Sequence, residues 1–228
     1  MDATPETLTI GIPIYDLVDP LDVAGPYEVF SNVTIGDKRA LRVLVLAEKA
    51  GKDVSVPTRF GLELVPQAAF DEVEHLDVLW VPGGDPKALN RLMKGGPYLD
   101  ALKRWSTNAR LVTSVCEGAM LLAAAGLLNG YRATTHWAFI RCFARFPGID
   151  PVPLNPDDPE CQWPRFVVDR NRVTGGGISS SLDEALQVVL MLFGQQVAES
   201  VQVTIQYFPD PPVQGAIPVP PGCPLDSA

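Results

Sequence analysis

The stretch RLVTSVCEGAMLLAAAGLLNG, residues 110–130, decides the fold that we expect for this chain. It opens with a short apolar and β-branched run that is typical of a buried strand. Cys116 follows this run, and the residues after it are rich in alanine and leucine up to Gly126 and Gly130, so they predict a helix. The pattern therefore places a thiol on the turn between a strand and a helix.

A cysteine on such a turn has the position of a nucleophile elbow. The sharp turn presents the nucleophile, and backbone N–H groups beside it stabilise the negative charge that develops on a substrate. The start of a helix also favours the thiolate, which is the reactive form. The alternative is an unreactive thiol at the end of a core strand, because free cysteine is among the most buried residue types. This stretch alone leaves both interpretations open.

The composition of the whole chain favours one α/β domain and argues against several classes of protein. With 228 residues, 46% of them hydrophobic and 20% charged, the chain suits one domain with a large core. No apolar run is long enough to span a bilayer and the first residues lack a basic segment, so we expect no membrane partner and a cytoplasmic protein. The net charge of −9, with dispersed basic residues, argues against a nucleic-acid partner.

The four cysteines are widely spaced and form no C-x-x-C pair, and the chain has two histidines. We therefore expect neither a disulfide framework nor a structural zinc site, but single-thiol chemistry in a reducing compartment. The glycine run at residues 175–177 is not a dinucleotide-binding motif and no P-loop lysine is present, so no nucleotide cofactor is expected. The cysteines are Cys116, Cys142, Cys161 and Cys223.

The pattern of apolar residues predicts alternating strands and helices in a single domain over residues 1–208. Proline-rich residues 209–228 are expected to form a tail that packs as an extended strap or frays. Predicted strands lie at residues 8–15, 41–47 and 77–81, short paired strands at 55–65, and a hairpin at 165–174 with Asn171 in its turn. Predicted helices lie at residues 97–107, 138–146, 181–193 and 195–207.

Asp22 follows the first predicted strand and precedes a helix that we expect around Pro26, since proline suits the first helical turn. Ligands of α/β proteins bind at this edge of the sheet, where strands pass into helices. A catalytic carboxylate is therefore one interpretation of Asp22. A solvated carboxylate at a helix start is the other.

Two further features lie at the same predicted edge. Gly83 and Gly84 directly follow a strand, and they form either an anion site made of backbone N–H groups or a plain turn. His136 lies 20 residues after Cys116, which suits one helix and a return to the same edge. The imidazole therefore either lies near the thiol or caps a helix.

Four segments of the chain together resemble the ThiJ/PfpI superfamily, whose fold is like that of class I glutamine amidotransferases. They occur in the family's order across residues 8–207, and they read DLVDPLDVAGPYEVF, VLWVPGG, RLVTSVCEGAMLLAAAGLLNGYRATTHW and VTGGGISSSLDEAL. Their L-D-x-x-G-P, C-x-G, A-T-T-H-W and T-G-G-G-I motifs are most similar to the isocyanide (isonitrile) hydratase branch. The amidase-like domains of some AraC-type transcription regulators share much of the pattern.

The resemblance implies a flavodoxin-like three-layer α/β sandwich with a mostly parallel central sheet, and a homodimer. It implies that Cys116 is the catalytic nucleophile and that Asp22 is the acidic residue beside it. In the protease-like branch a histidine follows the cysteine, so the Glu117 of this chain argues against peptidase activity; hydratase-type relatives are expected to carry a small hydroxyl residue there. The other implied site residues stabilise an anion or bind substrate: Gly83, Gly84, Glu117, Gly118 and His136.

The implied activity is the hydration of an isocyanide to the N-substituted formamide, without a metal or an organic cofactor. The Cys116 thiolate would attack the terminal carbon of a small-molecule substrate, Asp22 would manage the proton, and water would then release the product. The alternatives are a non-catalytic ligand-sensing or regulatory module and a glyoxalase-like or redox-responsive thiol protein. We expect no helix-turn-helix pair after residue 207, which disfavours a DNA-binding regulator.

Glu117 is expected to face solvent in the first turn of its helix and therefore to be ionised. A negative charge beside the thiol disfavours the thiolate, so Glu117 would raise the pKa of Cys116. The alternative is a side chain that points away and pairs on the surface.

Overall fold

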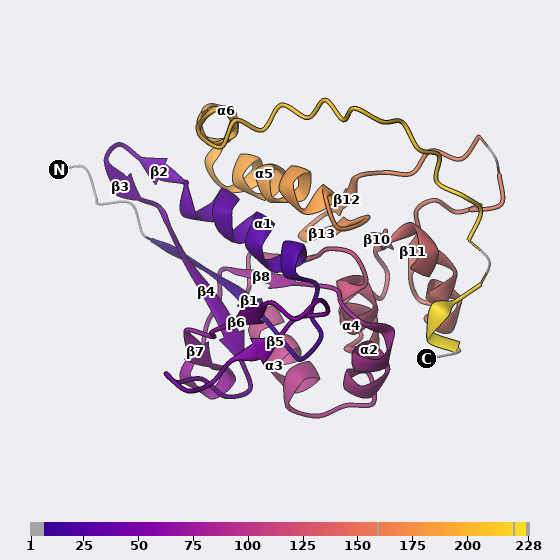
Figure 1. Ribbon diagram of the computed structural model, residues 1–228, viewed down its shortest axis with the longest axis horizontal. Coiled ribbons are helices and arrows are strands. Elements are labelled where there is room, and N and C mark those ends of the chain that lie inside the picture. The colour runs from indigo at the N-terminus through magenta and orange to yellow at the C-terminus, as the bar shows by residue number, and fades with distance from the viewer. Residues whose placement is uncertain (1–6, 159, 221, 227–228) are drawn as a thin grey trace.

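A seven-stranded sheet forms the middle layer of the molecule (Figure 1). The computed structural model describes residues 7–158, 160–220 and 222–226. Neighbouring strands are parallel, apart from the antiparallel pair of β12 and β13 at one edge. In sheet order the strands are β12 (Phe166–Asp169), β13 (Arg172–Gly175), β9 (Leu111–Ser114), β8 (Val78–Val81), β1 (Leu8–Pro13), β4 (Leu41–Ala47) and β7 (Ala68–Ala69).

Helices cover both faces of this sheet (Figure 1). One layer contains α1 (Pro20–Ser31), α5 (Ser180–Phe193) and α6 (Gln195–Thr204), and the other contains α2 (Pro86–Leu92), α3 (Pro97–Ser106) and α4 (Gly118–Ala124). The structure therefore confirms the flavodoxin-like three-layer sandwich. Short elements complete it: strand pairs β2 (Thr34–Ile35) with β3 (Lys38–Arg39), β5 (Val56–Pro57) with β6 (Glu63–Leu64), and β10 (Arg132–Ala133) with β11 (Asp150–Pro151), and the 3₁₀ helices η1 (Phe70–Glu72), η2 (Trp137–Arg145) and η3 (Pro224–Asp226).

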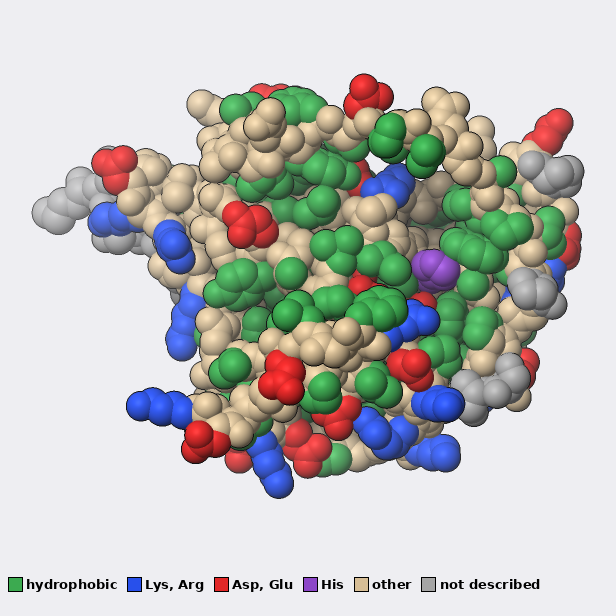
Figure 2. Space-filling view, in the orientation of Figure 1, with side chains coloured by type: hydrophobic (Ala, Val, Ile, Leu, Met, Phe, Trp, Pro, Cys, Tyr) green, Lys and Arg blue, Asp and Glu red, His purple; other side chains and the backbone are tan. Residues whose placement is uncertain are grey.

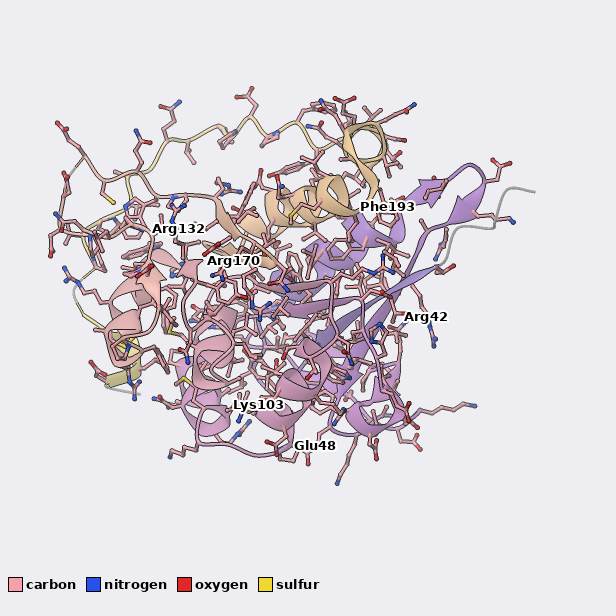
Figure 3. The ribbon with its side chains drawn as sticks, turned by 180° about the vertical axis from the view of Figure 1, so that it is seen from behind. Arg42, Glu48, Lys103, Arg132, Arg170 and Phe193 are labelled. Carbon is pink, nitrogen blue, oxygen red and sulfur yellow. A yellow bond between two sulfur atoms is a disulfide. The ribbon has the colours of Figure 1, made fainter. Side chains whose placement is uncertain are left out.

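The central strands are buried on both faces, which explains why they read as continuous apolar runs. Ile10 and Ile12 of β1 and all four residues of β8 are 0% exposed. Charged side chains such as Arg42 on β4 and Lys103 on α3 lie on the outside of the molecule (Figure 3). The connections after β1 and β8 leave the sheet in opposite directions at this centre, so the carboxyl ends of these two strands mark the crevice where α/β proteins bind ligands.

The first helix begins earlier than expected, at Pro20, and Pro26 lies inside it. Asp19 caps the helix, because its Oδ1 accepts a hydrogen bond from the Leu21 N–H at 3.2 Å. Pro26 has no N–H to donate to the Asp22 carbonyl one turn earlier. That carbonyl instead accepts a hydrogen bond from the Trp80 indole Nε1–H at 3.0 Å. The proline therefore does not break α1, because a side chain of β8 replaces the missing donor.

The expectation of unpaired cysteines is wrong for two of the four. Cys142 of η2 and Cys223 of the tail form a disulfide across 81 residues of sequence. No short motif marks this pair, because the two cysteines meet only when the tail returns to η2 and α2 (Figure 1). Cys116 and Cys161 are free.

The described tail residues are extended between α6 and η3. Among the described residues, no helix is both long and apolar enough to cross a bilayer.

The hydrogen bond from Trp80 predicts a specific rescue experiment. Trp80→Phe leaves the buried Asp22 carbonyl without a donor and should lower the free energy of unfolding by about 1–3 kcal/mol, measured by urea denaturation. Adding Pro26→Ala restores an N–H one turn away and should recover part of that loss. If Trp80→Phe lowers the free energy of unfolding equally in the wild type and in the Pro26→Ala protein, the indole does not replace the donor that Pro26 lacks.

Candidate active site

Cys116 lies on a tight turn between β9 and α4, as the elbow prediction requires. Its φ of +55° is in the left-handed region, which a non-glycine residue adopts at a cost of about 1–3 kcal/mol. Two neighbours hold the strained residue through its backbone. The Cys116 N–H donates to the Gly175 carbonyl at 3.2 Å, and the Thr135 hydroxyl donates to the Cys116 carbonyl at 2.8 Å.

Glycines allow the turn after β8 to lie directly against this elbow. A Cβ atom on Gly118 would collide with the carbonyl oxygen of Val81. A Cβ atom on Gly83 would collide with the Glu117 carboxyl group and lie 2.9 Å from the Cβ of Cys116. The two backbones thus approach more closely than any side chain permits.

Asp22 is fully buried in the first turn of α1, with 0% of its surface exposed. Its Oδ2 accepts a hydrogen bond from the Gly83 N–H at 2.8 Å, and its Oδ1 has no hydrogen-bond partner among the described residues. Asp19, not Asp22, caps the helix. The structure therefore does not support the interpretation of Asp22 as a solvated carboxylate at a helix start.

Asp22, Cys116 and Glu117 form one buried cluster. A carboxylate oxygen from each acid and the Cys116 Sγ all lie within 4.8 Å of one another. The structure thus brings together the two residues predicted to be catalytic, at the carboxyl ends of the central strands. This spacing also admits a metal ion, with one soft sulfur and two hard oxygen ligands, and the absence of a cofactor stays a prediction.

Glu117 does not face solvent, so that expectation is wrong. The residue is 3% exposed, and its Oε2 has no hydrogen-bond partner among the described residues. Burial raises the pKa of the Glu117 carboxyl above its usual value, and an interaction with the Cys116 thiol and the positive charge of Arg59 offset part of this rise. The physical reason is the short α4: its first turn packs under the turn at Gly83 instead of projecting into water.

The cluster holds its protons tightly. Burial raises the pKa of Cys116 well above its ordinary value, and the negative charges of Glu117 and Asp22 raise it further. Burial, then the charges of Glu117 and Asp19, raise the pKa of Asp22. These effects outweigh the thiolate-favouring helix start that the sequence suggested, because each ionised group would lack water and face another acid.

The predicted anion-stabilising N–H groups lie beside the thiol, but two of them have partners within the protein. The Gly83 N–H donates to Asp22, and the Gly118 N–H donates to the Val115 carbonyl at 2.9 Å. Gly84 is held against Leu17, where a Cβ atom would lie 2.6 Å from the Leu17 carbonyl oxygen. Their role toward a substrate stays a prediction.

His136 combines features of both interpretations offered for it. Its Nδ1 accepts a hydrogen bond from the Ala138 N–H at 3.3 Å, so it caps η2, which is a 3₁₀ helix and not the expected α-helix. The ring also packs on Gly177, where a Cβ atom would lie 2.5 Å from its Cδ2. Burial and then the charge of Arg59 lower the His136 pKa. Among the described residues, no hydrogen bond or ion pair joins it to Cys116.

Sequence reasoning missed Glu184, a further buried acid behind the elbow. Glu184 is 0% exposed, and neither of its carboxyl oxygens has a hydrogen-bond partner among the described residues. A Cβ atom on Gly175 would collide with this carboxyl, so the acid lies against the residue that binds the Cys116 N–H. A signal was available, because Glu184 shares the helical face of Ser181, Ala185 and Val188, which are buried.

Arg59 was also missed. Its backbone is tied to the loop before α1, where its N–H donates to the Val18 carbonyl at 2.9 Å. The charge of its side chain acts on both Glu117 and His136. Its place on the loop between β5 and β6 carries no pattern that would have indicated this.

The chain is similar in sequence and in fold to known proteins. Residues 9–191 match the model of the DJ-1/PfpI family. The isonitrile hydratase of Pseudomonas putida is 36% identical over 212 residues, which are 92% of this chain and 83% of that protein. An HTH-type transcriptional regulator of Pseudomonas aeruginosa, GbdR, is 26% identical over 64% of this chain and 37% of its own length. The crystal structure of a ThiJ/PfpI family protein from Pseudomonas syringae has a TM-score of 0.77 and 31% identity, covering 93% of this chain and 81% of that one.

Replacing Glu117 tests the electrostatics of the thiol. Glu117→Gln removes a buried carboxylate from beside the sulfur and should lower the pKa of Cys116. The measurement is the rate of iodoacetamide labelling of Cys116 against pH, read by peptide mapping so that Cys161 is separated. Glu48→Gln, at an exposed site, is the control. A higher thiol pKa in the Glu117→Gln protein would instead mean that the protonated carboxyl donates to the thiolate.

Replacing Glu184 tests the cost of a buried acid. Folding raises the pKa of this carboxyl, through burial and then through Asp22, so the folded state binds the proton more tightly. Stability should therefore fall as pH rises from the ordinary glutamate pKa toward the folded-state pKa. Glu184→Gln should make this decline smaller, so the variant should gain more Tm over the wild type at pH 8 than at pH 5. The gain should be about 2–4 °C for each kcal/mol of unfolding free energy recovered. Parallel Tm profiles for the wild type, Glu184→Gln and the exposed control Glu199→Gln would contradict the prediction.

Proposed function

Because the chain belongs to the DJ-1/PfpI family, we propose that it is a hydratase that uses Cys116 to add water to an isocyanide and release the N-substituted formamide. The observation that carries this proposal is the burial of the Cys116 sulfur within 4.8 Å of an Asp22 carboxyl oxygen, at the carboxyl ends of the central strands. The similarity to isonitrile hydratase over most of both chains supports the choice of substrate.

The first step joins the sulfur to the terminal carbon of R–N≡C. As the S–C bond forms, the thiol proton passes through Asp22 to that carbon, giving the thioimidate R–N=CH–S–Cys116, in which the sulfur stays bonded to the Cys116 Cβ. Asp22 suits this transfer because Gly83 holds its Oδ2, while its Oδ1 has no protein partner among the described residues and can carry the proton. Burial, then the charge of Glu117, raise the pKa of Asp22, so this carboxyl holds a proton more tightly than an exposed aspartate does.

The second step adds water to the thioimidate carbon. One proton of the water moves to nitrogen and the other returns through Asp22 to sulfur as the C–S bond breaks. The products are R–NH–CHO and the free Cys116 thiol, so the sum is one isocyanide plus one water. The site needs no cofactor for this balance.

A ligand-sensing module is the second candidate, and one observation favours it. The thiol is 1% exposed and its pKa is raised, which reduces its reactivity toward small electrophiles at neutral pH. The similarity to part of an HTH-type regulator is consistent with the same idea. Ligand binding without turnover would distinguish this candidate from the hydratase.

The homodimer and the cytoplasmic location stay predictions from the sequence. Light scattering on the purified protein would give twice the mass of one chain for the dimer. The Cys142–Cys223 disulfide is more typical of an oxidising compartment than of the cytoplasm, because the reducing cytoplasm keeps most thiols unpaired.

Two substitutions test the proposed activity. Cys116→Ser should abolish formamide production from an aryl isocyanide, because a serine hydroxyl is a far weaker nucleophile. Asp22→Asn keeps the shape and should lower kcat by roughly 10²-fold or more with little change in Tm, because an amide cannot carry the proton. Asp100→Asn, at an exposed site of α3, should behave as wild type. Full turnover in Cys116→Ser would refute the mechanism.

A further inference from the structure

A pocket of about 400 Å³ is lined by residues that adjoin Asp22 in the sequence or bind the backbone of Cys116. Its walls come from five segments that are far apart in the sequence: the start of α1, the residues around His136, the residues before β12, the connection from β13 to α5, and the tail. The space-filling view shows the molecule hollowed below the extended tail (Figure 2). The volume lies in the range of small-molecule sites.

Three wall residues connect this pocket to the catalytic cluster. Thr135 lines the pocket and donates its hydroxyl to the Cys116 carbonyl. Gly176 lines it and follows Gly175, whose carbonyl accepts the Cys116 N–H. Leu21 lines it and precedes Asp22. A ligand in the pocket therefore lies next to the peptide groups that hold the thiol.

The surface offered to a ligand is mainly apolar and aromatic. Two polar side chains of the wall already bind other groups of the protein: Arg165 binds Asp183 and Ser179, and the Ser180 hydroxyl accepts the Gly177 N–H at 2.8 Å. Flat aromatic groups pack well on indole rings in such surroundings. The apolar side chains of the wall are Leu21, Trp137, Trp163, Ile178 and Ile217.

The outer wall belongs to an extended segment, residues 209–220, which we call the strap. It leaves α6, passes along the outside of the α5 and β12 side of the molecule and returns toward η2 (Figure 1). Ile217 of the strap lines the pocket and is 45% exposed. Since most of the strap is exposed, it depends on attachments at its end.

Three attachments fasten that end. The Pro220 carbonyl accepts a hydrogen bond from the Arg141 Nε at 2.8 Å, and the Leu225 carbonyl accepts one from the Asn90 side chain at 3.0 Å. The disulfide joins Cys223 to Cys142. Arg141 and Cys142 belong to η2, whose first residue, Trp137, is part of the opposite pocket wall. One covalent link therefore ties the strap to the helix across the pocket.

We propose that this pocket binds the flat apolar N-substituent of the substrate, and that the strap, fastened by Cys142–Cys223, is its detachable outer wall. The substrate class rests on the proposed function, whereas the binding of a flat apolar group does not. A dithiol reductant would convert the disulfide to two thiols and itself become a cyclic disulfide. The strap would then keep only its noncovalent attachments, and ligands that need Ile217 would bind more weakly.

The first test measures binding apart from turnover. N-(2-naphthyl)formamide, the hydration product of an aryl isocyanide, is titrated calorimetrically into the Cys116→Ser protein. Adding Trp163→Ala or Ile217→Ala should raise Kd by about 5–10-fold, since each removes apolar contact with the ring. Val213→Ala, in the exposed strap outside the pocket, is the matched control and should leave Kd unchanged. Absence of binding, or binding that neither pocket substitution weakens, would overturn the pocket assignment.

The second test breaks the crosslink. Dithiothreitol should raise Kd by a similar factor in the otherwise unchanged protein and in a Cys161→Ser variant. A Cys142→Ser/Cys223→Ser protein should bind as weakly as the reduced form and should not respond to the reductant. Because the native Cys142–Cys223 disulfide is reduced in the folded protein, this arm of the test does not depend on whether a variant folds. Circular dichroism spectra recorded before and after reduction show whether the fold persists. Unchanged affinity with the fold intact, or loss of the fold on reduction, would overturn the detachable wall.

Turnover measurements separate this inference from the proposed function. Naphthyl binding that depends on Trp163 and Ile217, without hydration of any isocyanide, would refute the hydratase and leave the pocket standing. The opposite result is hydration of aryl and methyl isocyanides at rates that neither the substitutions at Trp163 and Ile217 nor reduction of the disulfide change. That result would refute the pocket and leave the hydratase standing.

Discussion

The buried cluster of Asp22, Cys116 and Glu117 depends on the close approach of two backbone turns. The turn after β8 lies so near the elbow after β9 that Gly83 and Gly118 leave no space for a side chain. This approach brings the Gly83 N–H to Asp22 and pushes the first turn of α4 inward. A larger residue at either position would separate the turns, so the arrangement of thiol and carboxyl depends on the absence of two Cβ atoms.

Burial then decides the chemistry of the acids. Asp22, Glu117 and Glu184 lie where water does not solvate their charges, and Asp22 raises the pKa of Glu184 just as Glu117 raises that of Asp22. The raised pKa values of these carboxyls mean that ionising them is costly for the folded state.

The tail forms part of the surroundings of the buried cluster, because it supplies one wall of the neighbouring pocket. Leu21 and Ile217, which lie more than 190 positions apart in the sequence, form walls of one pocket, and the Cys142–Cys223 disulfide fastens the end of the tail that supplies the second wall. The pocket is therefore formed mainly by helix ends, loops and the tail, and not by the strands of the central sheet. Loops and termini commonly vary while the scaffold persists, which suits a role in choosing the substrate.

Local patterns of residues were sufficient to predict the elements that depend only on neighbouring positions in the chain. Continuous apolar runs identified β1, β4 and β8, because central strands of a parallel sheet are buried on both faces. The strand, cysteine and helix in succession located the elbow, since the turn needs only adjacent residues. The pattern put Asp22 at the edge where strands pass into helices, and the resemblance to the ThiJ/PfpI superfamily placed it beside Cys116.

Tertiary structure alone decided whatever depended on contacts between distant segments. It buried Glu117 under the Gly83 turn, although the first turn of a helix usually faces water. It let α1 continue through Pro26, because Trp80 of another strand supplies the missing donor. It also paired Cys142 with Cys223, which no spacing marks. Local pattern reports which face of an element is apolar, whereas the partner that meets that face, and hence the charge, the hydrogen bond or the covalent link formed there, exists only once the chain has folded.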